Sequence, residues 1–319
     1  MLKRREDVLA VGVAGSVAYG DTWPGSDLDI EVVLKGDRPK QVVNTEQEIS
    51  VDYGYFGENH MAEIPYDTRP VYDPSGVLGR ELNPRNRDEI IERDIKEAIE
   101  QCGNLLRRAD EALKTNHYSA LVLLHLVAAS LAISFTLAAD ENRTIRRAVS
   151  RLEKATAKTG RRDFLENFST LFGFPATLEQ AGMLLSELEA GYKEIWGYFK
   201  DKPMGPGYMQ LQPDSEAWFR NRIRPVYEYD KRDLAWIVYS EFPFVLYYCF
   251  GLAGHERTPI DVFGEAAKLE GPPSLWVARH QRILKLFNPD DVPSLLETAR
   301  TLVSEVQQLS EARLWTRDG

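Results

Sequence analysis

Cysteine is scarce in this chain. Only Cys102 and Cys249 occur among 319 residues, and they are far apart in segments with helical periodicity. Two such residues provide neither a disulfide framework nor a cysteine-rich zinc site. The five histidines show no metal-ligand spacing either. We therefore expect a protein of a reducing compartment, the cytoplasm.

An excess of positive charge is also missing. The formal net charge is −10, and residues 1–85 alone carry −6, from 9 basic and 15 acidic residues. A protein held to a nucleic-acid backbone by charge alone has the opposite balance. The composition therefore argues against nucleic acid as the main partner.

Two local basic features keep a polyanionic partner open as an alternative. Basic residues recur at helical spacing in one segment, and arginines alternate after Trp218 and Phe219 in another. The first set is Arg143, Arg147, Arg151, Lys154 and Lys158, and the second is Arg220, Arg222 and Arg224. Such sets bind phosphates in some proteins and form solvated helix faces in others.

No hydrophobic run is both long and free of polar residues. The longest apolar stretch, Ala120 to Ala139, contains His125, Ser130 and Ser134 and precedes two acidic residues. It predicts a buried helix rather than a membrane span.

Periodicity predicts an α+β fold, with a small mixed-sheet domain followed by an all-helical domain. Apolar runs at Val8–Val13, Leu28–Leu34 and Glu48–Phe56 predict strands, and Val71–Tyr72 predicts a strand end before a turn. From residue 86 onward the spacing becomes helical, with helices expected at about 86–114, 117–139, 143–159, 161–172, 177–200, 230–253, 258–270, 272–287 and 291–314. We predict a catalytic domain over 1–85, a helical bundle over 86–200 and a further helical region over 201–319. The linker Lys202–Gly207 divides the two helical parts.

Candidate chemistry lies in the segment GSVAYGDTWPGSDLDIEVV, residues 15–33. Asp27 and Asp29 project to the same side of a strand, because side chains alternate along it. Two converging carboxylates suit Mg²⁺. The preceding strand ends at Gly15, and Ser16, at a glycine turn expected to open a helix, offers its hydroxyl and nearby N–H groups to phosphate oxygens.

This pattern resembles the polymerase-β-like nucleotidyltransferases. The resemblance rests on the Gly-Ser pair, on Gly20 and Asp21, and on Ser26-Asp27-Leu28-Asp29 before an apolar strand. Within that superfamily the chain is similar to kanamycin nucleotidyltransferase and related antibiotic nucleotidyltransferases over about the first 110 residues. The similarity continues through EISVDYGYF and RPVYDPSGVL.

The resemblance implies a reaction and its residues. Asp52 would join Asp27 and Asp29 around two Mg²⁺ ions, and an acceptor hydroxyl would attack the α-phosphorus of a nucleoside triphosphate and release pyrophosphate. The nucleotide would contact Gly15, Ser16, Ser26 and Tyr19. AMP is the expected group transferred, a small molecule the expected acceptor, and two subunits pair in related enzymes.

The resemblance also places a general base on the first long helix, at Glu100, with Glu97 as the alternative if the alignment is shifted. Two family cations are missing from this sequence. Tyr19 stands where relatives carry an arginine, and Asn104 stands where they carry a lysine. Three alternatives therefore stay open: transfer to a protein or an RNA, a non-catalytic nucleotide-binding module, and a metal-dependent phosphohydrolase.

Overall fold

The computed structural model describes eleven parts of the chain. These are residues 6–20, 22, 26–36, 40–44, 51–139, 141, 147–175, 177–199, 230–236, 272–287 and 291–315. Several sequence predictions lie outside them: Arg143, the linker Lys202–Gly207, the arginines at 220–224, Cys249, the helix at 258–270 and most of the helix at 230–253. The chain forms two compact units, Met1–Asp94 and Ile95–Gly319.

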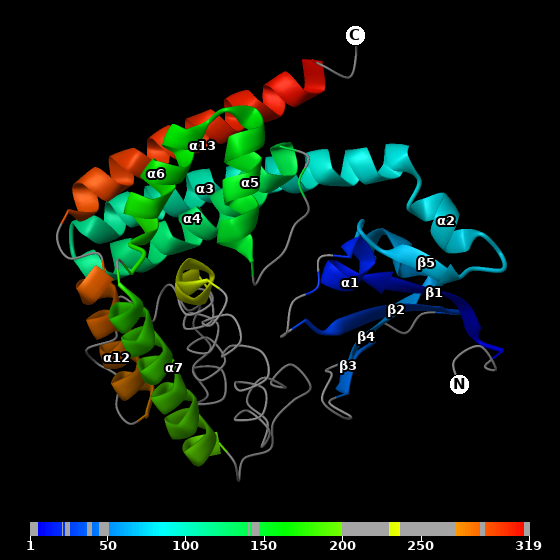
Figure 1. Cartoon of the computed structure of the whole chain (residues 1–319), viewed down its shortest axis with the longest axis horizontal. Coiled ribbons are helices and arrows are strands. Elements are labelled where there is room, and N and C mark those ends of the chain that lie inside the picture. The colour runs from blue at the N-terminus through cyan, green and yellow to red at the C-terminus, as the bar shows by residue number, and fades with distance from the viewer. Residues whose placement is uncertain are drawn as a thin grey trace. The chain divides into compact units, whose positions relative to one another are not determined.

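The first unit contains a mixed five-stranded sheet (Figure 1). Its strands are β1 (Val8–Ala14), β2 (Leu28–Leu34), β3 (Lys40–Asn44), β4 (Val51–Gly57) and β5 (Arg69–Tyr72), in the order β3-β4-β2-β1-β5. Strands β2 and β4 are parallel, and the other neighbouring pairs are antiparallel. The sequence predicted four of these strands and did not indicate β3.

Apolar residues lie on both faces of this sheet. Val33 on one face packs with Ala10 and Leu78, beneath η2 (Glu58–Glu63, a 3-10 helix) and α2 (Val77–Glu81). Val32 and Leu34 belong to a separate cluster on the opposite face. Asp29 and Glu31 lie on the same face as Val33, so these carboxylates are next to a buried apolar cluster along the strand.

The turn at residues 73–76 is structural, as the sequence indicated. The N–H of Gly79 donates to Asp73 Oδ2 (2.8 Å), and the N–H of Gly76 donates to the Asp73 carbonyl (3.1 Å). Asp73 therefore stabilises the turn that leads into α2.

Helix α3 (Pro84–Leu113) confirms the predicted first long helix and contributes residues to both units. Its buried residues Ile91, Ile95 and Cys102 recur at helical spacing, while Glu97 and Glu100 are exposed. The Cys102 thiol lies 3.8 Å from the carbonyl oxygen of Val127 in the next helix.

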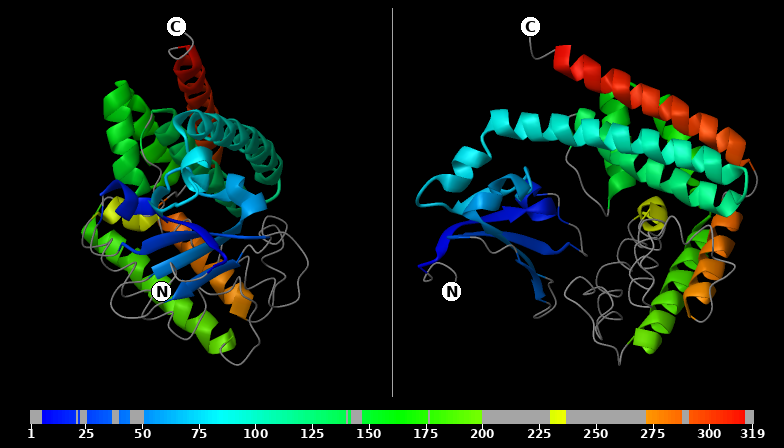
Figure 2. Two further views of the ribbon diagram at one scale, coloured as in Figure 1. Left: turned by 90° about the vertical axis from the view of Figure 1, so that its right-hand side faces the viewer. Right: turned by 180° about the vertical axis from the view of Figure 1, so that it is seen from behind.

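The second unit is helical in its described part (Figures 1 and 2). Its further helices are α4 (His117–Ala138), α5 (Ala148–Thr159), α6 (Arg162–Phe172), α7 (Leu178–Phe199), α12 (Pro272–Phe287) and α13 (Val292–Trp315). Helix α13 packs along α4 and α6, and α12 packs on α7. Gly191 permits the second contact, because a Cβ there would lie 2.8 Å from the Trp276 ring. These helices follow the mixed sheet in the chain, which confirms the predicted α+β class.

Helix α4 is the apolar segment singled out in the sequence. It is long and apolar enough to pass a length-and-composition test for a membrane span, and 78% of that window is buried. Helices α5, α6 and α13 pack on it, and Arg313 of α13 donates to its Leu137 carbonyl (2.6 Å). The burial of this helix agrees with the prediction of a core element.

Candidate active site

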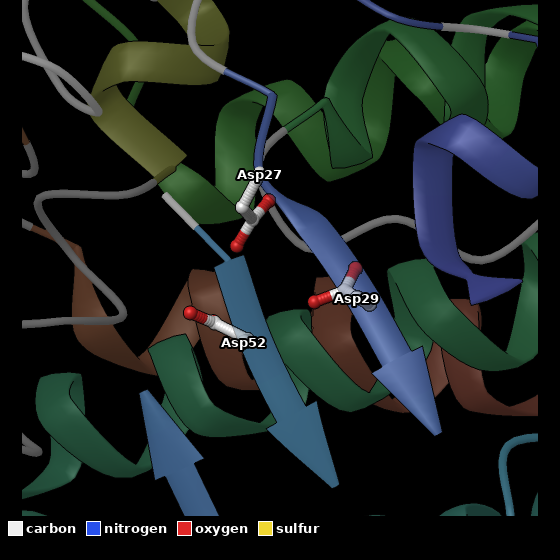
Figure 3. Close-up of side chains that lie close together, drawn as sticks. All are labelled: Asp27, Asp29 and Asp52. Atoms are coloured by element: carbon white, nitrogen blue, oxygen red, sulfur yellow. The ribbon is translucent and has the colours of Figure 1, made fainter. Parts of the chain in front are cut away.

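Three aspartates converge at one end of the sheet in the first unit. Asp27 immediately precedes β2, Asp29 lies on β2, and Asp52 lies on β4 (Figure 3). Asp29 and Asp52 are direct partners in the parallel register, which places their side chains on the same face. One carboxylate oxygen from each residue lies within 4.8 Å of those of the other two. The structure thus brings together the three residues that the sequence and the resemblance selected.

Gly15 allows the chain to turn closely past Asp29. Its φ of +65° lies in the left-handed region, which favours glycine, and a Cβ at this position would collide with Asp29 Oδ2. Its N–H donates to Asp67 Oδ2 (3.3 Å). Gly15 therefore places the end of β1 in close contact with the carboxylates of Asp29 and Asp67.

Ser16 is held against the segment that carries Asp27. It begins the short helix α1 (Gly15–Tyr19), and its Oγ donates to Ser26 Oγ (3.1 Å). Since Ser26 directly precedes Asp27, this hydrogen bond joins the serine predicted for phosphate binding to the start of the carboxylate cluster. Both serines are half-buried.

Glu31 is a carboxylate to which the sequence analysis gave no catalytic or metal-binding role. It is only 7% exposed, and its side chain lies over Gly54, where any Cβ would collide with it. Burial raises its pKa to about 7, and the negative charge of three neighbouring aspartates adds to this rise: Asp29, Asp67 and Asp52. Its place beside the cluster follows from the sequence, because Glu31 follows Asp29 by one strand period.

Asp67 was missed by the sequence analysis. It lies in the turn before β5, where Thr68 N–H donates to the Pro65 carbonyl (3.0 Å). Its carboxylate accepts from Gly15 and acts electrostatically on Glu31. No local motif marks it, because 52 residues separate Asp67 from Gly15.

Tyr19 acquires a cationic neighbour in the fold. The guanidinium carbon of Arg69, at the start of β5, lies 5.6 Å from the centre of the Tyr19 ring. A cation from a distant strand thus lies beside position 19, where the sequence has none.

The candidate bases Glu97 and Glu100 belong to the second unit, on the exposed side of α3. Their role stays a prediction from the resemblance. Asn104, on the same helix, accepts a hydrogen bond from Arg107 Nη2 (2.6 Å). A guanidinium therefore lies beside the position at which the sequence lacks the family lysine.

The predicted basic stripe is not a continuous exposed surface in its described part. Arg151 is only 8% exposed, and it lies 3.9 Å from a carboxylate oxygen of Glu141. The Lys158 ammonium lies 3.7 Å from the other oxygen of the same carboxylate. One acidic side chain thus offsets part of the charge of two members of the stripe.

Comparison with known proteins agrees with this geometry. Residues 1–101 match the sequence model of the nucleotidyltransferase domain family, which supports a nucleotidyltransferase enzyme and is consistent with the polymerase-β-like superfamily. No curated protein matches the chain. The matched region includes the three aspartates, Glu31 and both candidate bases.

Proposed function

We propose, from the premise that residues 1–101 carry a nucleotidyltransferase domain, that this enzyme transfers a nucleoside monophosphate to a hydroxyl of a small molecule. AMP is the group we expect it to transfer. The observation that supports nucleotidyl transfer most strongly is the convergence of Asp27, Asp29 and Asp52 within 4.8 Å.

The residues present fit a magnesium site. Three carboxylates supply the hard oxygen ligands that Mg²⁺ prefers, and the negative charge of Asp29 and Asp52 adds to the effect of burial in raising the pKa of Glu31. Asp27, Asp29 and Asp52 would hold the metal, with two ions proposed. When bound, Mg²⁺ neutralises triphosphate charge and stabilises the charge that develops at the transferred phosphoryl group.

The protein's own groups would bind the nucleotide and accept the proton. Ser16, oriented by Ser26, would hydrogen-bond the phosphate oxygens beside Gly15. Glu100 would take the proton from the acceptor hydroxyl as its oxygen attacks the α-phosphorus. The bond between the α-phosphorus and the bridging oxygen would break, and pyrophosphate would leave.

We propose that the acceptor is a small cation. Asp67 adds a carboxylate beside the three expected to bind metal, and residues 1–85 carry a net −6. A site of this charge favours a positively charged ligand such as an amino sugar. The polyanion alternative receives less support, because Glu141 offsets part of the basic stripe.

The acceptor can be identified by labelling. The full-length protein with Mg²⁺ is incubated with each nucleoside triphosphate labelled at the α-phosphate and with aminoglycosides, lincosamides, a protein extract or RNA. We expect a labelled small molecule and an equal amount of pyrophosphate. Label on protein or RNA would refute the small acceptor, and labelled monophosphate alone would indicate a phosphohydrolase.

Neutral acceptors provide the matched control for charge. N-acetylated aminoglycosides keep the hydroxyls of the parent compounds and lose the cationic amines. If the acidic end of the sheet selects cations, acetylation raises the KM for the acceptor and leaves the KM for the triphosphate unchanged. Equal KM values for acetylated and parent acceptors would remove the electrostatic argument.

A further inference from the structure

We infer that Arg69 binds the triphosphate, and that Tyr19 holds its guanidinium in place for this purpose. The inference rests on the proposed function and deepens it, because it names a residue that would contact the nucleotide. It starts from the contact between Arg69 and the Tyr19 ring, at 5.6 Å from the guanidinium carbon to the ring centre.

Tyr19 and Arg69 belong to elements next to the strands that carry the aspartates: α1 packs on β2, and β5 pairs with β1, the neighbour of β2. Arg69 begins β5, one of the two edge strands, and is the register partner of Val13, two residues before Gly15. Asp67, two residues before Arg69, accepts the Gly15 N–H. This hydrogen bond therefore holds the segment before β5 beside Gly15, where the chain passes close to Asp29.

Tyr19 connects this position to the phosphate-binding serine. It lies three residues after Ser16 on α1, and residues at this spacing share a helix face. Ser16 in turn bonds Ser26, the residue before Asp27. A phosphate held by Ser16 would thus lie on the side of α1 that carries the Tyr19 ring.

The geometry leaves the guanidinium able to bind an anion. A cation over an aromatic ring interacts through the ring face, and this contact does not neutralise its charge. The five N–H donors of arginine lie in the guanidinium plane and match phosphate oxygens in pairs. Arg69 is exposed, and no carboxylate of the described residues lies within ion-pair distance of it.

Arg80 shows the contrast within the same unit. Its Nη1 donates to the Ser75 carbonyl (2.8 Å), so this guanidinium stabilises the turn before α2. Both arginines are exposed and carry the same charge. Arg80 is therefore a matched control for the loss of one positive charge from this unit.

A binding measurement tests the inference without depending on the acceptor. The full-length protein is titrated calorimetrically with an α,β-methylene ATP analogue and Mg²⁺. We expect Arg69→Gln to weaken binding by about 10- to 100-fold, the range for a lost charge-assisted contact. Arg69→Lys should lose less, because it keeps the charge without the fork. Arg80→Gln should stay within about threefold of the unchanged protein, as expected of a surface charge.

Tyrosine variants test the holding role. Tyr19→Leu removes the aromatic face and should weaken analogue binding, while Tyr19→Phe keeps the ring and should retain more of it. In turnover assays Arg69→Gln should raise the KM for the triphosphate and leave the KM for the acceptor unchanged. A merely structural role would not separate the two constants.

The outcomes separate the two proposals. If the unchanged protein does not bind the analogue with Mg²⁺, the proposed function fails and this inference fails with it. If the unchanged protein binds but Arg69→Gln and Arg80→Gln bind equally well, only the assignment of Arg69 is overturned.

Discussion

Replacing Gly15 with alanine should lower the catalytic rate strongly while the protein stays folded. Gly15 has a φ of +65°, and a Cβ here would collide with the Asp29 carboxylate. Gly20, at the end of the same short helix, has a φ of +67°, and no heavy atom of the described residues lies within 4 Å of a Cβ built there. Both alanines would therefore experience the same backbone strain, and only one would displace a carboxylate of the site.

The strain and the displacement have different sizes. A non-glycine residue in the left-handed region costs about 1–2 kcal/mol, and both variants should lose roughly this much free energy of unfolding. At position 15 the Asp29 carboxylate must also shift by about 1 Å to reach ordinary contact distance. A displacement of that size among catalytic groups can lower a rate about 100-fold.

Two assays separate these effects. Urea unfolding should give similar free energies for Gly15→Ala and Gly20→Ala. Pyrophosphate release with Mg²⁺ and a triphosphate should fall about 100-fold in Gly15→Ala and change little in Gly20→Ala. Equal rates in two folded variants would show that the closeness of Gly15 to Asp29 has no catalytic importance.

Two further predictions concern the helical unit. Glu100→Gln should lower kcat more than Glu97→Gln in a steady-state assay, and the reverse order would move the base to Glu97. Burial lowers the pKa of His125 from 6.5 to about 3, so the unfolded chain takes up a proton below pH 6.5 that the folded chain does not. Stability is then lost as the pH falls from about 6.5 toward 3, by about 2 kcal/mol between pH 7 and 5 for this one group. His125→Gln should reduce that decrease in urea unfolding, whereas a change at the exposed His117 should leave it intact; equal slopes would contradict the buried neutral state.

Much of the fold could be predicted from periodicity. Strand β1 buries alternate residues, and β2 and α4 are largely apolar runs, so each carries a clear apolar pattern in the sequence. Strand β3 (Lys40–Asn44) does not, since it is a short edge strand with two adjacent valines and pairs only with β4. Its pairing depends on a neighbour that a local pattern cannot reveal.

The same distinction applies to the site. Asp27 and Asp29 could be predicted to converge because they are one strand period apart, and Asp52 because the resemblance requires a third carboxylate. Asp67 and Arg69 could not, because the turn before β5 reaches Gly15 and Tyr19 only through the order of the strands.

The missing family cations show that the residue type at one sequence position does not predict the charge around it in the fold. The sequence lacks a cation at Tyr19 and at Asn104, which argues against a phosphate site. In the structure Arg69 lies over the Tyr19 ring, and Arg107 donates to the Asn104 side chain. In each case a guanidinium from another position lies beside the residue that stands in place of the family cation.

Magnesium-dependent pyrophosphate release from a labelled triphosphate tests the central claim most directly. The unchanged protein and a variant at Glu63, an exposed carboxylate outside the triad, should release pyrophosphate at the same rate. The double variant Asp27→Asn, Asp29→Asn should stay folded and show only the rate without enzyme. Unchanged release by the folded double variant would contradict the assignment of the aspartates and, with it, the proposed site.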